Sequence, residues 1–177
     1  MDAKEIIIQA LGVIGVLASI AAYQCNEHKK LMILRTVNES FFAAQYFLLG
    51  AFTGMAMNII GCIRNIIFAK RVEANKSTTV WRIVFSIIFS IFIILTWSGF
   101  KSLLSGFAKV MSTVAYGSKN TAFVRIMCFF TSICWFIYNF CVKSYAGCVC
   151  EALTICSVLI GIIRIDIPKY TKVKKQA

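Results

Sequence analysis

Residues 81–100 read WRIVFSIIFSIFIILTWSGF, and Arg82 near the start is the only charged residue in this stretch. About 20 consecutive apolar residues are needed for a helix to cross the roughly 30 Å hydrocarbon core of a bilayer. The stretch therefore predicts a membrane-spanning helix. The rest of the chain has the same character, because 59% of its 177 residues are hydrophobic and its mean hydropathy is +0.79. Soluble domains contain roughly 45–50% apolar residues, so this composition predicts a membrane protein without a soluble domain of appreciable size.

Similar apolar runs on both sides of this stretch predict six more helices. The seven expected helices cover residues 5–23, 31–50, 52–69, 81–100, 102–117, 121–142 and 145–164. The run at 102–117 is short and contains Lys109, which leaves six spans and one re-entrant segment as an alternative. The predicted fold is all-α, a polytopic bundle of about seven transmembrane helices in one membrane domain, residues 1–177.

The basic residues test the seven-helix count, because a wrong count would scatter them over both ends of the bundle. With seven spans, fourteen of the nineteen Lys and Arg residues fall on one side. The other side holds Lys4, Lys101 and Lys143, while Arg64 and Lys109 lie inside spans. Positive charge favours the cytoplasmic side, so the amino terminus is expected outside and the carboxyl terminus in the cytoplasm. The fourteen are Lys29, Lys30, Arg35, Lys70, Arg71, Lys76, Arg82, Lys119, Arg125, Arg164, Lys169, Lys172, Lys174 and Lys175.

The chain also resembles itself after a shift of 93 residues, which aligns the first three helices with the last three without a gap. Seven identities fall in register: Ser19 with Ser112, Ala22 with Ala115, Tyr23 with Tyr116, Ile33 with Ile126, Phe47 with Phe140, Gly54 with Gly147, and Arg71 with Arg164. The match predicts a parallel 3+1+3 repeat about an axis along the membrane normal. Its parts are a first repeat at 1–71, a linker helix at 72–101, a second repeat at 102–164 and a basic tail at 165–177.

Polar residues recur at helical spacing inside five of the expected spans, and such residues face helix interfaces or watery cavities. Residues 52–69 carry Gly54, Asn58, Gly61 and Asn65, and residues 102–117 carry Ser105, Lys109, Ser112 and Tyr116. The simplest arrangement directs all five faces to one interior between the first three helices and the last three, which we call the two triplets. The expected lining of a substrate site there is Glu151, Asn58, Trp135, Asn139, Tyr46 and Glu39, with Lys109 or Arg64 tuning its charge.

Several of these residues also have a purely structural interpretation. Arg35 and Glu39 are four residues apart, which favours a local ion pair on one helix. Arg64 lies close to the expected cytoplasmic end and could extend its side chain to the membrane surface. The glycines in the polar faces could simply allow close packing. Glu151 lies about six residues inside the outer boundary, where a carboxyl either pairs with a base or has a raised pKa. Both are costly without a function, and Lys109 is the candidate base.

The sequence gives no support for several other classes of protein. A nucleophile with a matching base, a glycine-rich phosphate loop and a two-histidine metal motif are missing from it, so we do not expect an enzyme. His28 is the only histidine, and the eight cysteines lack metal-ligand spacing, so no metal and no cofactor are expected. The net charge of +12 is explained by topology rather than by nucleic-acid binding. The lipid bilayer is the expected partner, and the sequence does not decide whether a homo-oligomer forms.

Five segments carry a resemblance to the YgjV-type bacterial inner-membrane proteins over nearly the whole chain. They are GVIG at 12–15, FLLG at 47–50, IR at 63–64, CWFIYNF at 134–140, and the segment from Gly147 through Glu151 to IIR at 162–164. The resemblance implies a small multi-pass protein of the bacterial inner membrane and carries no settled activity.

The 3+1+3 plan is similar to the SWEET and PQ-loop group, which moves small solutes between two three-helix bundles. That group takes its name from a Pro-Gln pair within the repeat, whereas the only proline here, Pro168, lies outside both repeats. Gly54 and Gly147 would have to act as the hinges.

Two functions follow as hypotheses. The first is a facilitator or secondary transporter of a small polar metabolite, which binds between the two triplets. The second is a membrane interaction or sensory protein that transports nothing. A water-accessible cavity that reaches Glu151 and Asn58 would favour the first, and apolar packing over both would favour the second.

Overall fold

A computed structural model of the chain describes residues 3–48, 52–95, 97, 100–141 and 145–168. The described residues form seven α-helices, and the last one continues into a short π-helix. Each expected helix is present, with ends that move by five residues or fewer, so the all-α prediction is confirmed. The elements are α1 (Ala3–Tyr23), α2 (His28–Leu48), α3 (Phe52–Glu73), α4 (Thr79–Leu95), α5 (Phe100–Tyr116), α6 (Thr121–Cys141), α7 (Tyr145–Gly161) and η1 (Ile162–Asp166).

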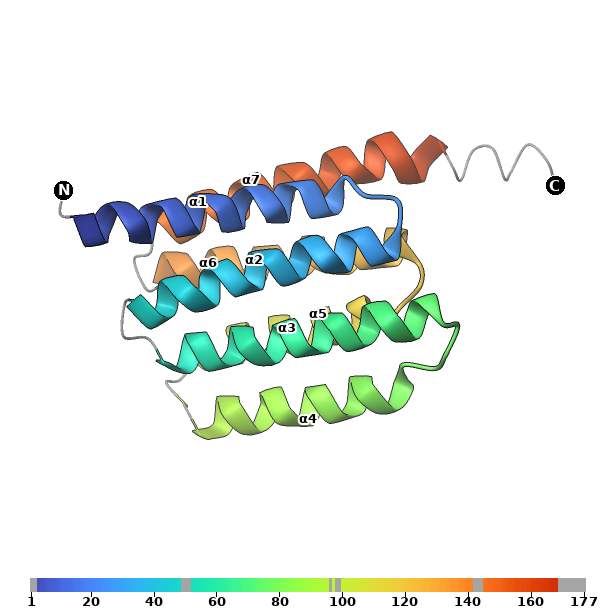
Figure 1. The fold of residues 1–177 in the computed structure, drawn as a ribbon, viewed down its shortest axis with the longest axis horizontal. Coiled ribbons are helices and arrows are strands. Elements are labelled where there is room, and N and C mark those ends of the chain that lie inside the picture. Colours follow the sequence, from blue (N-terminus) through green and yellow to red (C-terminus); the bar gives the residue numbers. More distant parts are fainter. Residues whose placement is uncertain (1–2, 49–51, 96, 98–99, 142–144, 169–177) are drawn as a thin grey trace.

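The helices form two layers that run in the same general direction (Figure 1). α1, α2, α3 and α4 lie side by side in one layer, and α7, α6 and α5 lie behind them. The layers meet where α1 packs on α7 and where α4 and α3 pack on α5. α5 is one uninterrupted helix of 17 residues, about 25 Å long. A single unbroken helix of this length favours a full span over a re-entrant segment, which stays an untested alternative.

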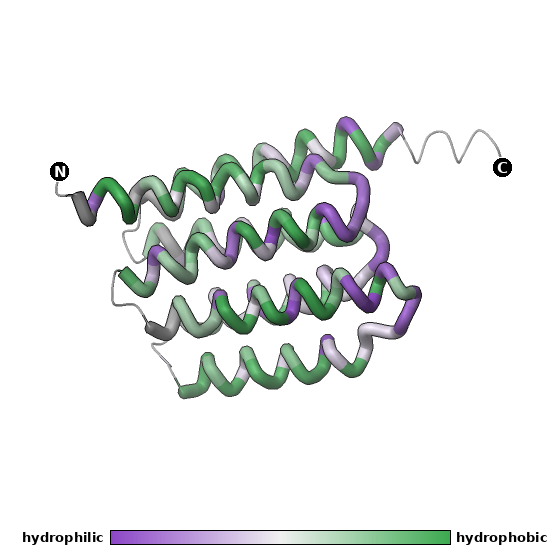
Figure 2. The backbone as a smooth tube through the Cα atoms, in the orientation of Figure 1, coloured by the Kyte–Doolittle hydropathy of each residue, from purple (hydrophilic) through white to green (hydrophobic). Residues whose placement is uncertain are grey.

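The packing is the reverse of that of a soluble protein. Arg64 and Arg125 are completely buried, whereas Val80, Ile94 and Leu95 are 69–75% exposed. An apolar outer surface over a partly polar interior is what a bilayer requires, because the lipid-facing side chains need no water. Figure 2 shows apolar helices whose hydrophilic residues gather on the loops at one end of the bundle.

Three segments are long and apolar enough to cross a membrane by length and composition alone: Glu5–Tyr23, Thr121–Tyr138 and Cys148–Asp166. The apolar α4 is slightly shorter. The helices α2, α3 and α5 do not meet this criterion, and they are the ones that carry Arg35, Glu39, Arg64 and Lys109. These helices are less apolar because they carry the charged side chains that meet inside the bundle.

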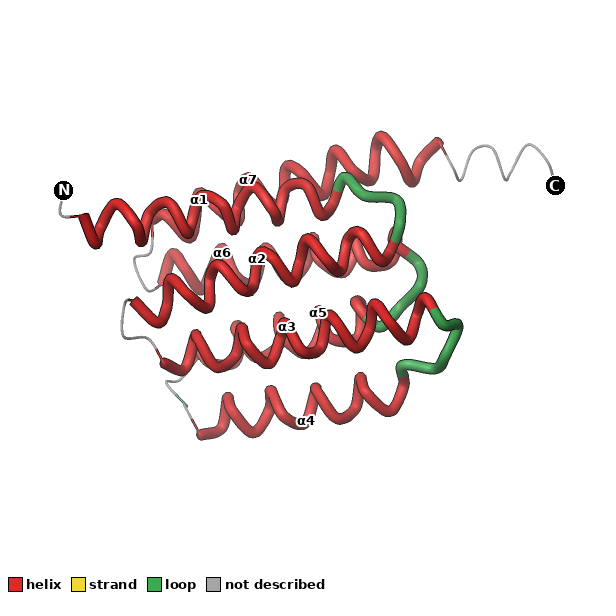
Figure 3. The backbone as a smooth tube through the Cα atoms, viewed as in Figure 1, coloured by secondary structure: helices red, strands yellow, loops and turns green. Residues whose placement is uncertain are grey.

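The loops at 24–27, 74–78 and 117–120 lie at the same end of the bundle as η1 (Figure 3). Local side-chain and backbone chemistry fixes the turns. Asn75 has a φ of 53°, which ends α3 in the left-handed conformation that asparagine tolerates. Asn120 caps α6, because its Oδ1 accepts hydrogen bonds from the backbone N–H groups of Ala122 and Phe123. We refer to this end, which carries most of the described basic residues, as the basic end.

Arg125 ties several elements together at the basic end. Its guanidinium donates to both carboxylate oxygens of Asp166, at 2.8 and 2.6 Å, and to the carbonyl oxygens of Cys25 at 2.7 Å and Tyr23 at 3.3 Å. One fully buried side chain thereby joins α6 to η1 and to the end of α1.

Replacing Arg125 with Lys is expected to lower the free energy of unfolding by about 3 kcal/mol, because a single ammonium cannot make the paired contacts and Asp166 loses its matched partner. Thermal unfolding of the purified protein in detergent measures the change. The control is Lys29→Met, which removes the exposed 2.6 Å pair with Glu73 and should change stability by less than about 1 kcal/mol. Equal losses for the two variants would contradict the role assigned to Arg125.

Candidate functional site

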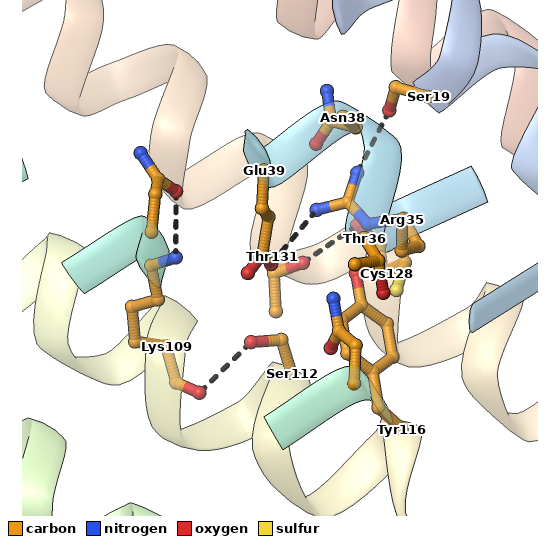
Figure 4. Close-up of polar contacts among 12 residues, drawn as sticks. Ser19, Arg35, Thr36, Asn38, Glu39, Lys109, Ser112, Tyr116, Cys128 and Thr131 are labelled. Carbon is orange, nitrogen blue, oxygen red and sulfur yellow. Dashed lines mark hydrogen bonds and ion pairs between the residues drawn. The ribbon is translucent and has the colours of Figure 1, made fainter. Parts of the chain in front are cut away.

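Five polar residues from three helices meet in the interior of the bundle. We call them the central cluster: Arg35 and Glu39 from α2, Arg64 and Asn65 from α3, and Lys109 from α5. Figure 4 shows Arg35 and Glu39 on one side, opposite Lys109 and Ser112. Glu39 is 2% exposed, Lys109 is 8% exposed, and Arg64 and Asn65 are completely buried. The helical spacing noted in the sequence brings these side chains together, because each lies on the inward face of its helix.

Arg64 is the most completely bonded member of the central cluster. Its Nη2 donates to Glu39 Oε1 at 3.0 Å, and its Nη1 donates to Thr113 Oγ1 at 3.0 Å. Further hydrogen bonds reach Ser112 Oγ at 3.4 Å and Asn65 Oδ1 at 3.1 and 3.2 Å. The guanidinium also lies 4.9 Å from the ring centroid of Tyr116. The interpretation that Arg64 extends to the membrane surface is therefore wrong, because the acceptors that it needs lie inside.

Glu39 lies between two guanidinium groups. The expected pair with Arg35 is present at 3.8 Å, but the contact with Arg64 is shorter, at 3.0 Å. Arg35 directs its Nη1 to Ser19 Oγ at 2.9 Å instead. Its guanidinium carbon also lies 5.7 and 5.6 Å from the rings of Tyr23 and Tyr116. Two cations therefore share one carboxylate.

Lys109 has few partners for a buried ammonium group. Its Nζ donates to Asn58 Oδ1 over a long 3.5 Å and lies 5.7 Å from the Phe89 ring. Within the described part of the chain it forms no ion pair within 4.0 Å. The expectation that Lys109 pairs with Glu151 is therefore wrong, because Lys109 bonds to Asn58 on α3.

Three buried polar atoms of the central cluster have no hydrogen-bond partner among the described residues. They are Arg35 Nε, Glu39 Oε2 and Asn65 Nδ2. The Asn65 and Glu39 side chains face each other, so Arg35 Nε is the donor of this set that a ligand could complete.

The other residues of the expected site form a second group nearer the opposite end. The Glu151 carboxyl faces the hydroxyl of Ser132, and the cations that act on it electrostatically are Arg35 and Lys109. Tyr46 lies near Tyr138 and Glu151, and the rings of Trp135 and Tyr138 meet edge to face with centroids 5.4 Å apart.

Direct contacts therefore join the expected site residues in two sets, and Arg35 and Lys109 act electrostatically on Glu151 of the second set. Asn58, Glu39, Lys109 and Arg64 lie together in or beside the central cluster, whereas Glu151, Tyr46 and Trp135 lie in the second group. Asn139 belongs to α6, Gly54 to α3 and Gly147 to α7, but what surrounds these three residues lies outside what the structure describes.

The central cluster is closed to water at the basic end. Two shallow hollows lie there, and neither reaches Asn58 or Glu151. The first is lined by Asn26, Glu27, His28, Lys29, Val72, Glu73 and Lys119. Behind them Tyr23 and Tyr116 meet through their hydroxyl oxygens, 3.4 Å apart, and both are almost completely buried. The groups that close the bundle are thus partly polar and aromatic, rather than purely apolar.

Sequence reasoning placed Ser112, Asn65 and Tyr116 on inward faces but gave them no role in the site. Thr113 was missed altogether, because it is one residue off the helical spacing that selected Lys109 and Ser112. Its hydroxyl donates to Lys109 O at 2.7 Å, within its own helix, and accepts from Arg64. Only the contact with the buried Arg64, which the structure reveals, identifies Thr113 as part of the site.

Comparison with known proteins gives the chain a family. It matches the Imp-YgjV family model, described as bacterial inner membrane protein, over residues 6–169. This range includes both groups of the site, and it confirms the resemblance drawn from the sequence motifs. No curated protein and no solved structure matches the chain.

Proposed function

The chain belongs to the Imp-YgjV family of bacterial inner membrane proteins, and we propose that it is a facilitator or secondary transporter of a small polar metabolite. The observation that carries the proposal is the central cluster. Charged residues inside a membrane protein are costly, and they usually mark the path of a solute or an ion. Helix packing alone needs no such groups, because small residues and weak interhelical hydrogen bonds are sufficient. The proposed activity moves a solute without changing it chemically.

The proposed orientation has the amino terminus outside and the basic end in the cytoplasm. The described loops at that end carry Lys29, Lys76 and Lys119, and Figure 2 shows its hydrophilic character. This asymmetry is the pattern expected of loops that remain in the cytoplasm.

The mechanism requires two triplets that move relative to each other, and repeat-related contacts support this arrangement. Tyr23 and Tyr116, which the 93-residue shift matches, contact each other. The carbonyl oxygen of Tyr23 accepts a hydrogen bond from Arg125 of α6, at 3.3 Å, and that of Tyr116 lies 2.8 Å from His28 Nε2 of α2. The first helix of each triplet is thus held by the second helix of the other.

A second pair of contacts has the same relation. Arg64 of α3 bonds to Thr113 of α5, and Ser157 of α7 donates to Ile20 O of α1 at 2.8 Å. The shift of 93 residues matches position 64 with position 157 and position 20 with position 113. The interfaces α3 with α5 and α7 with α1 are therefore exchanged when the two triplets are exchanged, as a two-fold axis requires. A rocking motion about this axis would open one end while the other remains closed.

A second candidate function is a membrane interaction or sensory protein. The observation that favours it is the burial of the central cluster, in which Glu39 is 2% exposed and Arg64 and Asn65 are completely buried. In our proposal the same feature is the closed conformation of a transporter. Flux measurements separate the two functions.

The experiment begins with a thermal-shift screen of sugars, amino acids and organic acids on the purified protein, because a ligand of the folded state raises the unfolding temperature. The stabilising compound is then radiolabelled and used for counterflow in proteoliposomes. Wild-type protein is expected to exchange it. Failure of every stabilising compound to exchange would favour the second candidate.

Glu151→Gln is expected to reduce this flux at least tenfold while the protein remains folded, because the second group loses its carboxylate but keeps its shape. The matched control is Glu73→Gln, which makes the same change at an exposed position of the basic end and should leave flux unchanged. Equal flux from wild-type and Glu151→Gln protein, at equal reconstituted amounts, would exclude a role for Glu151 in transport.

A further inference from the structure

The central cluster contains more positive than negative charge. Arg35, Arg64 and Lys109 contribute three cations, and Glu39 contributes one carboxylate. An unpaired cation buried in this way costs several kcal/mol, even after the surroundings relax. Glu151 offsets one charge at most, and its carboxyl lies in the second group.

The three cations differ in how much bonding capacity they have left. Arg64 is surrounded by acceptors from Glu39, Asn65, Ser112 and Thr113, so it holds helices α2, α3 and α5 together. Lys109 has three N–H donors and, among the described residues, a single long hydrogen bond of 3.5 Å, to Asn58. Two of its donors are therefore available to a ligand.

Arg35 also has unused capacity. Its Nη1 bonds to Ser19, and its buried Nε has no partner among the described residues. The pair with Glu39 is long, at 3.8 Å, because Arg64 occupies the same carboxylate oxygen more closely. The groups with spare donors are thus Lys109 and Arg35, neither of which makes a short contact with Glu39.

We propose that the central cluster binds a small organic anion with a carboxylate group, and that Lys109 and Arg35 donate to it. This inference rests on the proposed function, since the anion is the transported solute. An anion supplies the missing negative charge and accepts the unused N–H bonds, and charge-assisted hydrogen bonds of this kind are about twice as strong as neutral ones. A sugar or another neutral solute would leave the excess charge uncompensated.

The test measures thermal unfolding of the full chain in detergent with four probes: sodium acetate, sodium succinate, glucose and choline chloride. Sodium chloride keeps the ionic strength constant. The carboxylates are expected to raise the unfolding temperature of wild-type protein by about 3–5 °C at ten times their dissociation constant. Glucose and choline should produce no rise. Stabilisation by glucose or choline in place of the carboxylates would overturn the proposal.

Lys109→Met is expected to remove the carboxylate-dependent rise without lowering the unfolding temperature in sodium chloride, because it removes one of the excess cations. The matched control, Lys70→Met, changes an exposed lysine of α3 and should keep the full rise. If Lys109→Met protein does not fold, Lys109→Arg provides the second variant, since it keeps the charge and should keep the rise. A full carboxylate response in Lys109→Met protein would overturn the role of Lys109.

Counterflow in proteoliposomes separates this inference from the proposed function. Carboxylate binding without carboxylate exchange would contradict transport but leave the anion site in place. Exchange of a neutral or cationic solute, with no binding of carboxylates, would support transport and overturn the anion site.

Discussion

Glu39→Gln protein is expected to unfold about 10 °C below wild type, which corresponds to a loss of about 3–5 kcal/mol. Glutamine has nearly the shape of glutamate and can still accept a hydrogen bond from Arg64, so the substitution removes little except the negative charge. Among the described residues, Glu39 is the only carboxylate in direct contact with the cations of the central cluster. Without it, Arg35, Arg64 and Lys109 remain buried with no counter-charge beside them.

The comparison with Arg64→Gln makes this prediction specific to charge. Both substitutions remove the same ion pair, whose atoms lie 3.0 Å apart. Arg64→Gln, however, reduces the excess of positive charge and leaves Glu39 with Arg35, whereas Glu39→Gln increases that excess. We therefore expect Glu39→Gln to be the more destabilising of the two, by at least about 1 kcal/mol.

Fluorescence-detected size-exclusion chromatography after heating measures both unfolding temperatures without labelling the cysteines. Glu73→Gln is the control for neutralising an exposed glutamate, and its effect should stay below about 1 kcal/mol. Equal losses for Glu39→Gln and Arg64→Gln would mean that the ion pair itself, rather than the balance of charge, stabilises the centre of the bundle.

The helices were the predictable part of this molecule. A membrane helix is signalled by a continuous apolar run, and the run does not depend on which helices lie beside it. The inward faces were also predictable, because Asn58, Gly61, Asn65 and Lys109 are polar or small at helical spacing. Local sequence contains this information, since the period of the helix fixes which residues share a face.

The partners of the charged residues were not predictable in the same way. Arg64 was expected at the membrane surface because of its distance from the helix end, but its direction depends on how α3 is rotated against α2 and α5. Lys109 was expected to pair with Glu151, yet Asn58 lies closer. Such choices are set by packing between helices that are distant in the sequence, and neither hydropathy nor spacing contains them.

The contact of Arg125 with Asp166 was missed for a different reason. The last helix was expected to end at residue 164, so Asp166 was treated as part of the tail. In the structure η1 extends the helix to Asp166, which brings its carboxylate to the buried guanidinium. An error of two residues in a helix end therefore concealed an ion pair.

The second large effect is expected at Gly61 of α3, where the sequence suggested only close packing. A methyl group added at Gly61 would overlap the Oε2 atom of Glu39. The carboxylate would have to turn away, and its contact with Arg64 would be lost. Alanine in place of a helical glycine gains about 1 kcal/mol of helix propensity, but displacing a buried ion pair costs about 3–5 kcal/mol. The clash therefore outweighs the propensity, and Gly61→Ala is expected to lose about 2–4 kcal/mol.

Gly12→Ala provides the matched control on α1. A methyl group there would lie 2.9 Å from Gln45 Nε2, the end of a flexible side chain. Gln45 can rotate away at the cost of its 3.2 Å hydrogen bond to Ile8 O, about 1 kcal/mol. The gain in helix propensity offsets that cost, so this variant should unfold within about 2 °C of wild type. Unfolding temperatures measured side by side in one detergent decide the matter. If Gly61→Ala protein is as stable as Gly12→Ala protein, the Glu39 carboxylate does not lie against α3, and the geometry assigned to the central cluster is wrong.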